Sequence, residues 1–255
     1  MGCFAGSGGH NKIVPGANSQ FGIEHVEDRK FLDAVANYVQ AAGWKYVNCS
    51  DEVGTTKSAV WSNAADNHLR VKDSDVDLQF HLNATPGGTG CEVWLHPKYG
   101  DRELAAKISK AMADAFGLKD RGIKFSTDLG WINKTKTGLL PEICFIDNET
   151  DMQKYRANFD KAAKAVAEVI VGRSIKSSGT SQSIAPSKQN IIQTGAFSPY
   201  ETPDVMGALN SLKMTAKFIL EPSGLTYFVT DPTSDAQLKG MKGWLDKKGW
   251  WYEVK

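Results

Sequence analysis

A histidine and a glutamate near the N-terminus are placed where one metal ion could use both. His10 follows two glycines, so its ring stands on a turn whose backbone can bend sharply and admit another group. Glu24 opens the strongly helical segment that comes next. Between them, residues 15–19 contain Pro-Gly and Asn-Ser pairs, which predict a loop that folds back. The fold-back would bring the two side chains together, but a His/Glu pair needs a third ligand and a base before it can do chemistry.

Two later strand-like runs carry candidates for the third ligand and for the base. Residues 76–84, VDLQFHLNA, alternate apolar and polar side chains and end in a turn, which predicts a strand with His81 near its C-terminal end. α/β sheets place their ligands at that end. Residues 139–148, LLPEICFIDN, form a strand-like run in which the carboxylate of Glu142 has apolar neighbours. Burying an ionised carboxylate is costly, so Glu142 needs a partner, such as Arg121 or a lysine, or a chemical role.

Several motifs then arrive in a fixed order, namely GGHN, PGA, Glu24, DLQFHLNA, GCEVWLH, LKDRGIK and LLPEICFIDN. In this order they resemble the zinc-dependent N-acetylmuramoyl-L-alanine amidases of the amidase-3 family, which occur in phage endolysins and bacterial autolysins. The resemblance covers about residues 3–172. It implies that His10, Glu24 and His81 hold Zn2+ and that Glu142 is the catalytic acid/base. The stretch before His10, MGCFAGSGG, departs from the family in being short and Gly-rich, which leaves the register of the first strand open.

These residue types suit hydrolysis of an amide. Two neutral imidazoles and one carboxylate leave zinc with an open position, as in catalytic rather than structural zinc sites. Water bound there has its pKa lowered towards ~7, and the metal polarises the amide carbonyl. The resemblance places Glu142 to take the proton of the water and pass it to the departing amine. Apolar neighbours of Glu142 in LLPEICFIDN would raise its pKa towards the useful range.

Other histidines compete for the metal. His25 adjoins Glu24 but would point about 100° away on a helix, which predicts an exposed side chain. His68 lies in a helical segment and is expected to be a surface or interhelix group. His96 ends a strand beside that of His81 and is the more serious rival.

The four cysteines are scattered, without C-x-x-C spacing, at positions 3, 49, 91 and 144. They are predicted to be buried thiols rather than a disulfide framework or a thiolate zinc site. In a strand, Cys144 would share a face with Glu142, two residues away, so a cysteine nucleophile is the alternative interpretation.

Composition places the chain among ordinary globular proteins and limits its partners. It has 255 residues, 41% hydrophobic and 23% charged, with a formal charge of +1. Nothing therefore predicts the dense basic face of a nucleic-acid partner. No apolar run approaches the ~20 residues that cross a bilayer, so no membrane anchor is expected. The N-terminus also lacks a Sec-type signal pattern, which predicts residence in a host cytoplasm until something releases the protein.

Helical and strand-like segments alternate through the first two thirds of the chain. Helices are expected at residues 24–42, 59–71, 101–116 and 152–171, and strands at 44–49, 76–84, 90–96 and 139–148. This alternation is typical of an α/β fold, here a wound mixed sheet with flanking helices. The predicted catalytic domain is residues 1–174.

Residues 175–188 are rich in Ser and have no apolar period, which predicts a flexible linker. Residues 189–255 then follow the order βαββαβ, a small α+β ferredoxin-like domain. With TGAFSPYET near its start, this domain resembles the SPOR-like peptidoglycan-binding modules attached to such amidases. Five aromatic residues could contact the wall, although half or more are expected in the core of so small a domain: Trp244, Trp250, Trp251, Tyr227 and Phe228.

The resemblance implies a peptidoglycan hydrolase, an N-acetylmuramoyl-L-alanine amidase that cleaves the amide between N-acetylmuramic acid and L-alanine. A phage endolysin, kept in the host cytoplasm until a holin releases it to the cell wall, is the expected biological setting. A host autolysin of the same chemistry, a zinc exopeptidase and a non-catalytic wall-binding protein on the same fold are the alternatives. The sequence gives no oligomeric state.

Overall fold

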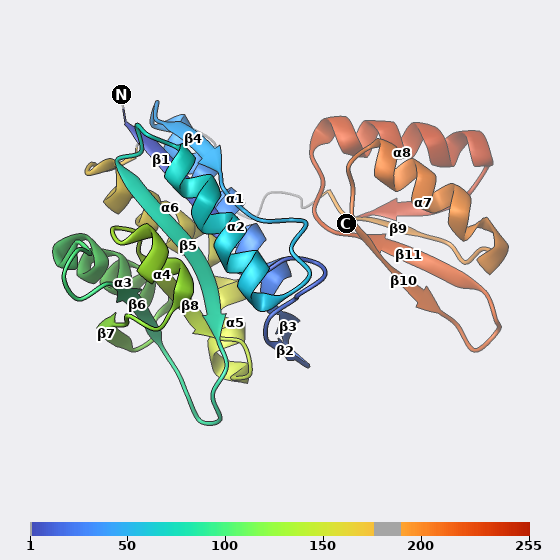
Figure 1. Cartoon of the computed structure of the whole chain (residues 1–255). Coiled ribbons are helices and arrows are strands. Elements are labelled where there is room, and N and C mark those ends of the chain that lie inside the picture. Colours follow the sequence, from blue (N-terminus) through green and yellow to red (C-terminus); the bar gives the residue numbers. More distant parts are fainter. Residues whose placement is uncertain (1, 176–189) are drawn as a thin grey trace. The chain divides into compact units, whose positions relative to one another are not determined.

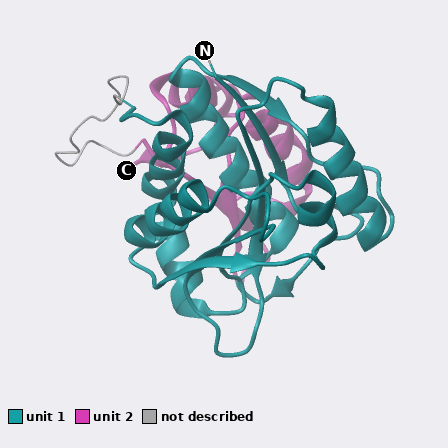
Figure 2. Cartoon of the chain, turned by 60° about the vertical axis from the view of Figure 1, so that its left-hand side comes forward, with its two compact units in different colours: residues 1–178 teal, residues 179–255 magenta. Residues whose placement is uncertain are grey.

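The computed structural model describes residues 2–175 and 190–255, which fall into two compact units, residues 1–178 and 179–255 (Figures 1 and 2). Most of the predicted linker, residues 176–188, lies outside the described residues. Ile175 is described, and it packs into the hydrophobic core of the first unit. The domain limits 1–174 and 189–255 remain predictions.

The first unit is a six-stranded sheet with helices on both faces (Figure 1). Its elements are β1 (Cys3–Gly8), β2 (Asn18–Ser19), β3 (Gly22–Ile23), α1 (Glu24–Ala41), β4 (Lys45–Asn48), α2 (Lys57–Arg70), β5 (Val76–Asn83), β6 (Cys91–Leu95), α3 (Arg102–Phe116), β7 (Asp120–Phe125), α4 (Gly130–Thr135), β8 (Leu140–Phe145), α5 (Glu149–Ala157) and α6 (Phe159–Val171).

The strand order is β4-β1-β5-β8-β6-β7. All neighbours are parallel except β6 and β8, which run antiparallel, so the predicted mixed sheet is confirmed. Helices α1, α3 and α6 pack together over one face, and α2 and α4 pack together over the other. Both faces are therefore covered, as expected of a mainly parallel sheet.

Alternation along β5 separates its two faces. Val76, Leu78, Phe80 and Leu82 are buried in the core with α1, α3 and α6. The polar residues between them, Asp77, Gln79 and His81, point to the other face because strand side chains alternate with a period of two. The site is built on this second face.

Helix α3 shows how local sequence sets these elements. The Asp101 side chain accepts a hydrogen bond from the backbone N–H of Leu104 and caps the first turn. Ile108, Met112 and Phe116 are buried along one stripe. The helix ends at Gly117, whose φ of 70° is easily adopted only by a residue without a Cβ.

One long helix was expected over residues 152–171, but the structure has two. Asn158 ends α5 and begins α6, with a φ of −121° that no α-helix contains. Both the backbone N–H and the side-chain amide of Asn158 donate to the carbonyl of Lys154, so this residue closes the last turn of α5. The break lets α5 and α6 bury different faces.

A bulge in β8 overturns the expected orientation of Cys144. His81 is paired with Glu142, but Asn83 is paired with Phe145, so β8 contains an extra residue there. Phe145, not Cys144, therefore follows Glu142 on that face. The Cys144 thiol lies in the core, 3.7 Å from the sulfur of Met152. All four cysteines are free and buried, as predicted.

The second unit has the predicted βαββαβ order. It comprises β9 (Ile192–Thr194), a 3-10 turn η1 (Pro199–Glu201), α7 (Thr202–Ser211), β10 (Ala216–Leu220), β11 (Thr226–Thr230), α8 (Asp235–Lys248) and β12 (Tyr252–Val254). The sheet order is β10-β11-β9-β12, and all pairs are antiparallel. This is the split βαβ arrangement of ferredoxin-like folds.

The aromatic residues of this unit divide as expected. Phe228 is fully buried, and Trp244 and Trp250 pack against the same core. Trp251 is 63% exposed and borders a hollow of about 420 Å³ that Phe197 and Trp250 also line. Trp251 therefore exposes part of its ring beside this hollow.

No helix in the described part of the chain is both long and apolar enough to cross a membrane.

Candidate metal centre

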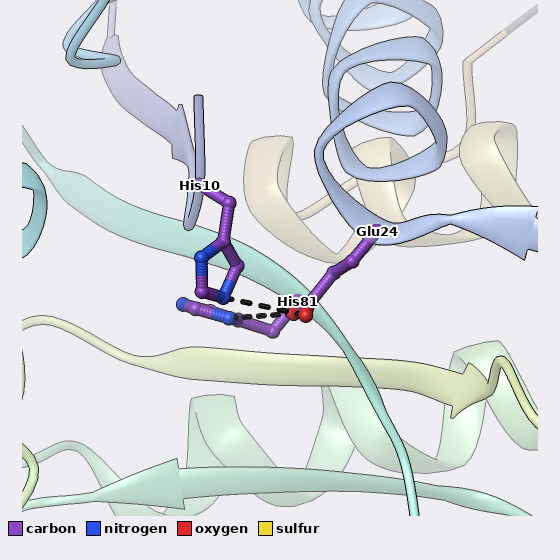
Figure 3. Close-up of side chains that lie close together, drawn as sticks. All are labelled: His10, Glu24 and His81. Carbon is purple, nitrogen blue, oxygen red and sulfur yellow. Dashed lines mark hydrogen bonds and ion pairs between the residues drawn. The ribbon is translucent and has the colours of Figure 1, made fainter. Parts of the chain in front are cut away.

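Three of the predicted site residues meet at one point, although they come from different elements. His10 follows the C-terminal end of β1, Glu24 is the first residue of α1, and His81 lies near the C-terminal end of β5. Figure 3 shows the three side chains converging, with the Glu24 carboxylate facing both rings. The loop between β1 and α1 folds back as the sequence predicted, because the N–H groups of Glu24 and His25 donate to the carbonyls of Ala17 and Pro15.

The distances are short enough for one ion. Nε2 of His10 lies 3.3 Å from Oε2 of Glu24, and Nδ1 of His81 lies 2.9 Å from Oε1 of Glu24. The three ligand atoms all lie within 4.8 Å of one another. Ligands ~2.0–2.1 Å from a tetrahedral zinc are roughly 3.3 Å apart, so the cluster has the right size for such a site.

Hydrogen bonds and burial set the charge state of the cluster. Glu24 is buried, which alone would raise its pKa, but hydrogen bonds with His10 and His81 outweigh burial and hold the pKa well below its usual range. Its carboxylate also accepts from the N–H groups of Ala17 and Leu82, at 2.7 and 3.2 Å. Burial lowers the pKa of His81, against the opposing effect of Glu24. A carboxylate facing a neutral imidazole is the form that binds a cation.

Two glycines leave the space that these side chains fill. A Cβ on Gly9 would lie 1.9 Å from Cε1 of His81. A Cβ on Gly16 would lie 2.4 Å from Oε2 of Glu24 and 2.6 Å from Cδ2 of His10. Gly16 also has a φ of 76°, which a residue with a side chain rarely adopts. The Gly-rich sequence around His10 is therefore required by the geometry of the cluster.

We expect Gly16→Ala to weaken metal binding by about tenfold or more, because the added methyl displaces Glu24 or His10. Gly43→Ala is the matched control. Gly43 has a φ of 84° but nothing within 4 Å of the added Cβ, so it suffers the backbone strain alone. Metal titration and thermal unfolding of both variants distinguish the effects. Equal metal affinity in the two variants would show that the Gly16 methyl does not reach the cluster.

Glu142 lies beside the cluster without belonging to it. Glu142 on β8 is the register partner of both His81 on β5 and Glu92 on β6, so the three residues form a row across the sheet. The expected alternative partner, Arg121, instead donates to Glu92 at 2.6 Å. Oε2 of Glu142 is buried and has no hydrogen-bond partner in residues 2–175 or 190–255. Burial first, and then the charges of Glu24 and Glu92, raise the pKa of Glu142 well above its ordinary value.

The competing histidines lie outside the cluster. His96 is buried, packs on Tyr99 and accepts a hydrogen bond from the N–H of Lys98. His25 is half-buried rather than exposed, because helix α1 begins inside the folded loop. His68, expected at a surface or between helices, is buried and hydrogen-bonded to Ser7 and Asp77.

Two residues that hold the His10 turn were not predicted. The buried carboxylate of Asp28 accepts from the N–H of Gly9 at 3.0 Å, and the guanidinium of Arg29 donates to the carbonyl of His10. Burial raises the pKa of Asp28 well above its ordinary value, against the opposing charge of Arg29. The signal was present in the sequence, since Asp28 follows Glu24 by one helical turn and so lies on the same face of α1.

The residues present fit a divalent metal ion. The donor set is two imidazoles and one carboxylate, the composition of catalytic zinc sites. Nε2 of His10 faces Glu24, whereas its Nδ1 is buried and has no hydrogen-bond partner among the described residues. The site thus defines an α/β protein with a candidate metal-binding cluster near the C-terminal ends of two strands.

Comparison with known proteins places the chain in a family. A family model described as N-acetylmuramoyl-L-alanine amidase matches residues 6–171, and the chain belongs to this family. A second model, the PlyG cell wall binding domain, matches residues 211–254. The expected wall-binding class therefore has support, whereas the SPOR-like label remains a prediction.

Individual relatives agree with this placement. An uncharacterized protein of Clostridium perfringens is 30% identical over 181 residues, which are 66% of this chain and 51% of that protein. The endolysin of Bacillus phage SPP1 is 34% identical over 86 residues, 31% of each chain. The chain spans about half the length, or less, of the curated relatives it matches.

The fold has counterparts among solved structures. The catalytic domain of the CD27L endolysin, which targets Clostridia difficile, superposes with a TM-score of 0.59 at 24% identity. The match covers 69% of this chain and 99% of that domain. This similarity confirms the α/β fold predicted for the first unit.

Proposed function

We propose that this protein is a zinc-dependent N-acetylmuramoyl-L-alanine amidase, which hydrolyses the amide between the lactyl group of N-acetylmuramic acid and L-alanine. The observation that carries the proposal is the cluster of His10, Glu24 and His81 with Glu142 beside it in register, in a chain of the amidase family. The zinc ligands are His10, Glu24 and His81.

Zinc, when bound, supplies a Lewis acid that activates water and polarises the scissile carbonyl. The neighbouring carboxylate of Glu142 takes the proton of the attacking water and gives it to the departing amine of L-alanine. Burial raises the pKa of Glu142 well above its ordinary value, which makes this carboxyl a stronger base than an exposed glutamate. Side chains of His10 and His81 are 18% and 15% exposed, so the site is reachable from solvent.

A phage endolysin is the biological setting that we favour. One relative is the endolysin of Bacillus phage SPP1, and the C-terminal unit matches the PlyG cell wall binding domain. The partner is therefore bacterial peptidoglycan, and the protein acts on the cell wall. A bacterial autolysin would use the same residues and the same chemistry.

Mass spectrometry of a purified wall digest tests the reaction. An amidase releases intact stem peptides with a free L-alanine amino terminus and leaves glycan strands without new reducing ends. A zinc exopeptidase on the same fold would release free amino acids, and a non-catalytic wall-binding protein would release nothing. Either of these last two results would overturn the proposal.

The first unit is expected to carry out catalysis, and the second unit is expected to bind the cell wall. A chain ending after residue 178 keeps Ile175 in its core, and it retains His10, Glu24, His81 and Glu142. We expect it to bind zinc and to cleave soluble muropeptide as well as the full chain does. It should lyse intact walls about tenfold less well at low enzyme concentration, because tethering raises the local concentration of enzyme.

The isolated C-terminal unit, residues 179–255, is the complementary test. It should sediment with walls and cleave nothing, and Trp251→Ala should weaken its sedimentation because Trp251 borders the aromatic hollow. A C-terminal unit that stays in the supernatant with every wall preparation would contradict the wall-binding role.

A further inference from the structure

A row of buried polar side chains runs behind the metal cluster and is not used by the proposed reaction. On β5, Asp77, Gln79 and His81 share the face opposite the apolar core. Gln79 is 1% exposed, Ser7 beside it on β1 and His68 on α2 are also buried, and Asp77 and His81 are half-buried. Burying an amide without partners is costly, so the contacts of Gln79 define what this row does.

The row forms an unbroken chain of hydrogen bonds that ends at a proposed zinc ligand. Nε2 of His81 lies 3.2 Å from Oε1 of Gln79, and Nε2 of Gln79 lies 3.4 Å from Oγ of Ser7 on β1. Oγ of Ser7 lies 2.9 Å from Nε2 of His68 on α2. Nδ1 of His68 lies 2.7 Å from Oδ1 of Asp77. Three elements thus contribute to one connected network.

Each link fixes the direction of the next. The Asp77 carboxylate can only accept, so Nδ1 of His68 carries the proton and donates. Nε2 of neutral His68 then accepts from the hydroxyl of Ser7. The Ser7 oxygen accepts from the amide N–H of Gln79, which turns Oε1 of Gln79 towards His81.

The consequence at His81 is a defined tautomer. Oε1 of Gln79 can only accept, so Nε2 of His81 carries the proton. Nδ1 of the neutral ring is then a bare lone pair, and it faces Oε1 of Glu24 at 2.9 Å. Two lone pairs directed at one point repel each other unless a cation lies between them. In the metal-free protein a proton on Nδ1 makes this contact a hydrogen bond to Glu24, and a metal ion takes the place of that proton when it binds.

We propose that Gln79, Ser7, His68 and Asp77 are positioning residues that hold His81 as the Nε2–H tautomer, with Nδ1 presented to the metal. This inference rests on the proposed function, since it takes His81 to be a metal ligand. Partners of this kind orient a ligating histidine and raise its basicity, and losing them typically weakens metal binding by about 10–100-fold.

Three variants of the full-length chain test the proposal by zinc affinity, measured by competition with a chromophoric chelator. Gln79→Met keeps the length of the side chain but removes the acceptor, and we expect the zinc dissociation constant to rise by about 10–100-fold. Ser7→Ala breaks the chain of hydrogen bonds one link further from His81, so it should raise the zinc dissociation constant by a smaller factor. Ser109→Ala is the matched control, because Ser109 is also fully buried and hydrogen-bonded, to Asp120, but is not linked to His81.

A rescue variant separates positioning from a purely structural role. Gln79→Glu restores an acceptor for Nε2–H of His81 and should keep zinc affinity close to that of the unmodified protein. In thermal unfolding, Gln79→Glu should be less stable than Gln79→Met, because burying a carboxylate costs more free energy than burying a thioether. If the network were only structural, zinc affinity would follow stability, with Gln79→Glu weaker than Gln79→Met, and the proposal would be overturned.

Nitrogen NMR of the histidine side chains reads the tautomer directly. In the zinc-loaded protein, the His81 ring should carry its proton on Nε2, and in Gln79→Met the exchange protection of that proton should be lost. A proton on Nδ1 of His81 in the zinc-loaded protein would refute the inference. Failure of the proposed metal site is distinguishable, because the unmodified protein itself would then bind no zinc.

Discussion

Replacing His81 with alanine is expected to abolish stoichiometric zinc binding and wall lysis while the fold persists. His81 is one of the three proposed protein ligands, and a zinc site reduced to two protein ligands should not hold its metal. The fold should survive because β5 is anchored by the buried side chains of Leu78, Phe80 and Leu82 on its other face. Elemental analysis after dialysis, circular dichroism and a turbidity assay measure the three outcomes.

His96→Ala is the control for this experiment. His96 is a buried histidine of the same unit, but it contacts Tyr99 and the backbone of Lys98 rather than the cluster. It should keep stoichiometric zinc and should lose only some stability. Stoichiometric zinc in His81→Ala, or lost zinc in His96→Ala, would show that the ligand set is wrong.

Local signals in the sequence indicated where each of the three residues lies, and the family resemblance joined them into one ligand set. A glycine pair before His10, a fold-back loop before Glu24 and the alternation around His81 each constrain one short segment. The sheet then brings the segments together, because strand ends of a parallel sheet meet at one edge. The side of β5 on which His81 lies followed from the apolar residues on either side of it.

Other features depend on contacts that no local pattern contains. The bulge between Glu142 and Phe145 shifts the register by one residue, which moved Cys144 into the core and left Phe145 beside Asn83. The break at Asn158 depends on a single side chain that bonds the preceding turn. The burial of His68 required partners from β1 and β5, and these are distant in sequence.

Strand β7 and helix α4 were missed for a simpler reason. The residues of β7, Asp120–Phe125, are mostly polar and half-exposed, so their pattern carries no apolar alternation. The six residues of α4, Gly130–Thr135, are too few for a helical period to be read. Both elements are specified by packing against neighbours.

Replacing Glu142 with glutamine should separate metal binding from catalysis. Glutamine keeps the shape of the side chain but cannot transfer the proton, so turnover should fall by roughly 10²–10⁴-fold while zinc remains bound. Zinc content and the rate of muropeptide cleavage measure the two effects. A variant that loses its metal would make Glu142 a ligand, and a variant that keeps its turnover would remove it from the reaction.

The same substitution is expected to stabilise the metal-free protein at neutral pH. The folded-state pKa of Glu142 is raised above its unfolded value, so the ionised carboxylate opposes folding. This penalty is absent below the unfolded pKa, grows as the pH rises towards the folded pKa, and is full above it. Glu142→Gln removes it, so the melting temperature should rise relative to the unmodified protein above about pH 5 and be unchanged at lower pH.

Glu92→Gln is the matched control, and it should have the opposite sign. Glu92 is the register partner of Glu142 on the adjacent strand and is buried, but Arg121 donates to its carboxylate at 2.6 Å. Removing the negative charge leaves the guanidinium without its partner, so Glu92→Gln should lower the melting temperature at neutral pH. Opposite shifts from one chemical change at neighbouring positions would mean that Glu142 is held without a partner for its chemistry. If Glu142→Gln destabilised the metal-free protein as Glu92→Gln does, Glu142 would instead be a structural carboxylate.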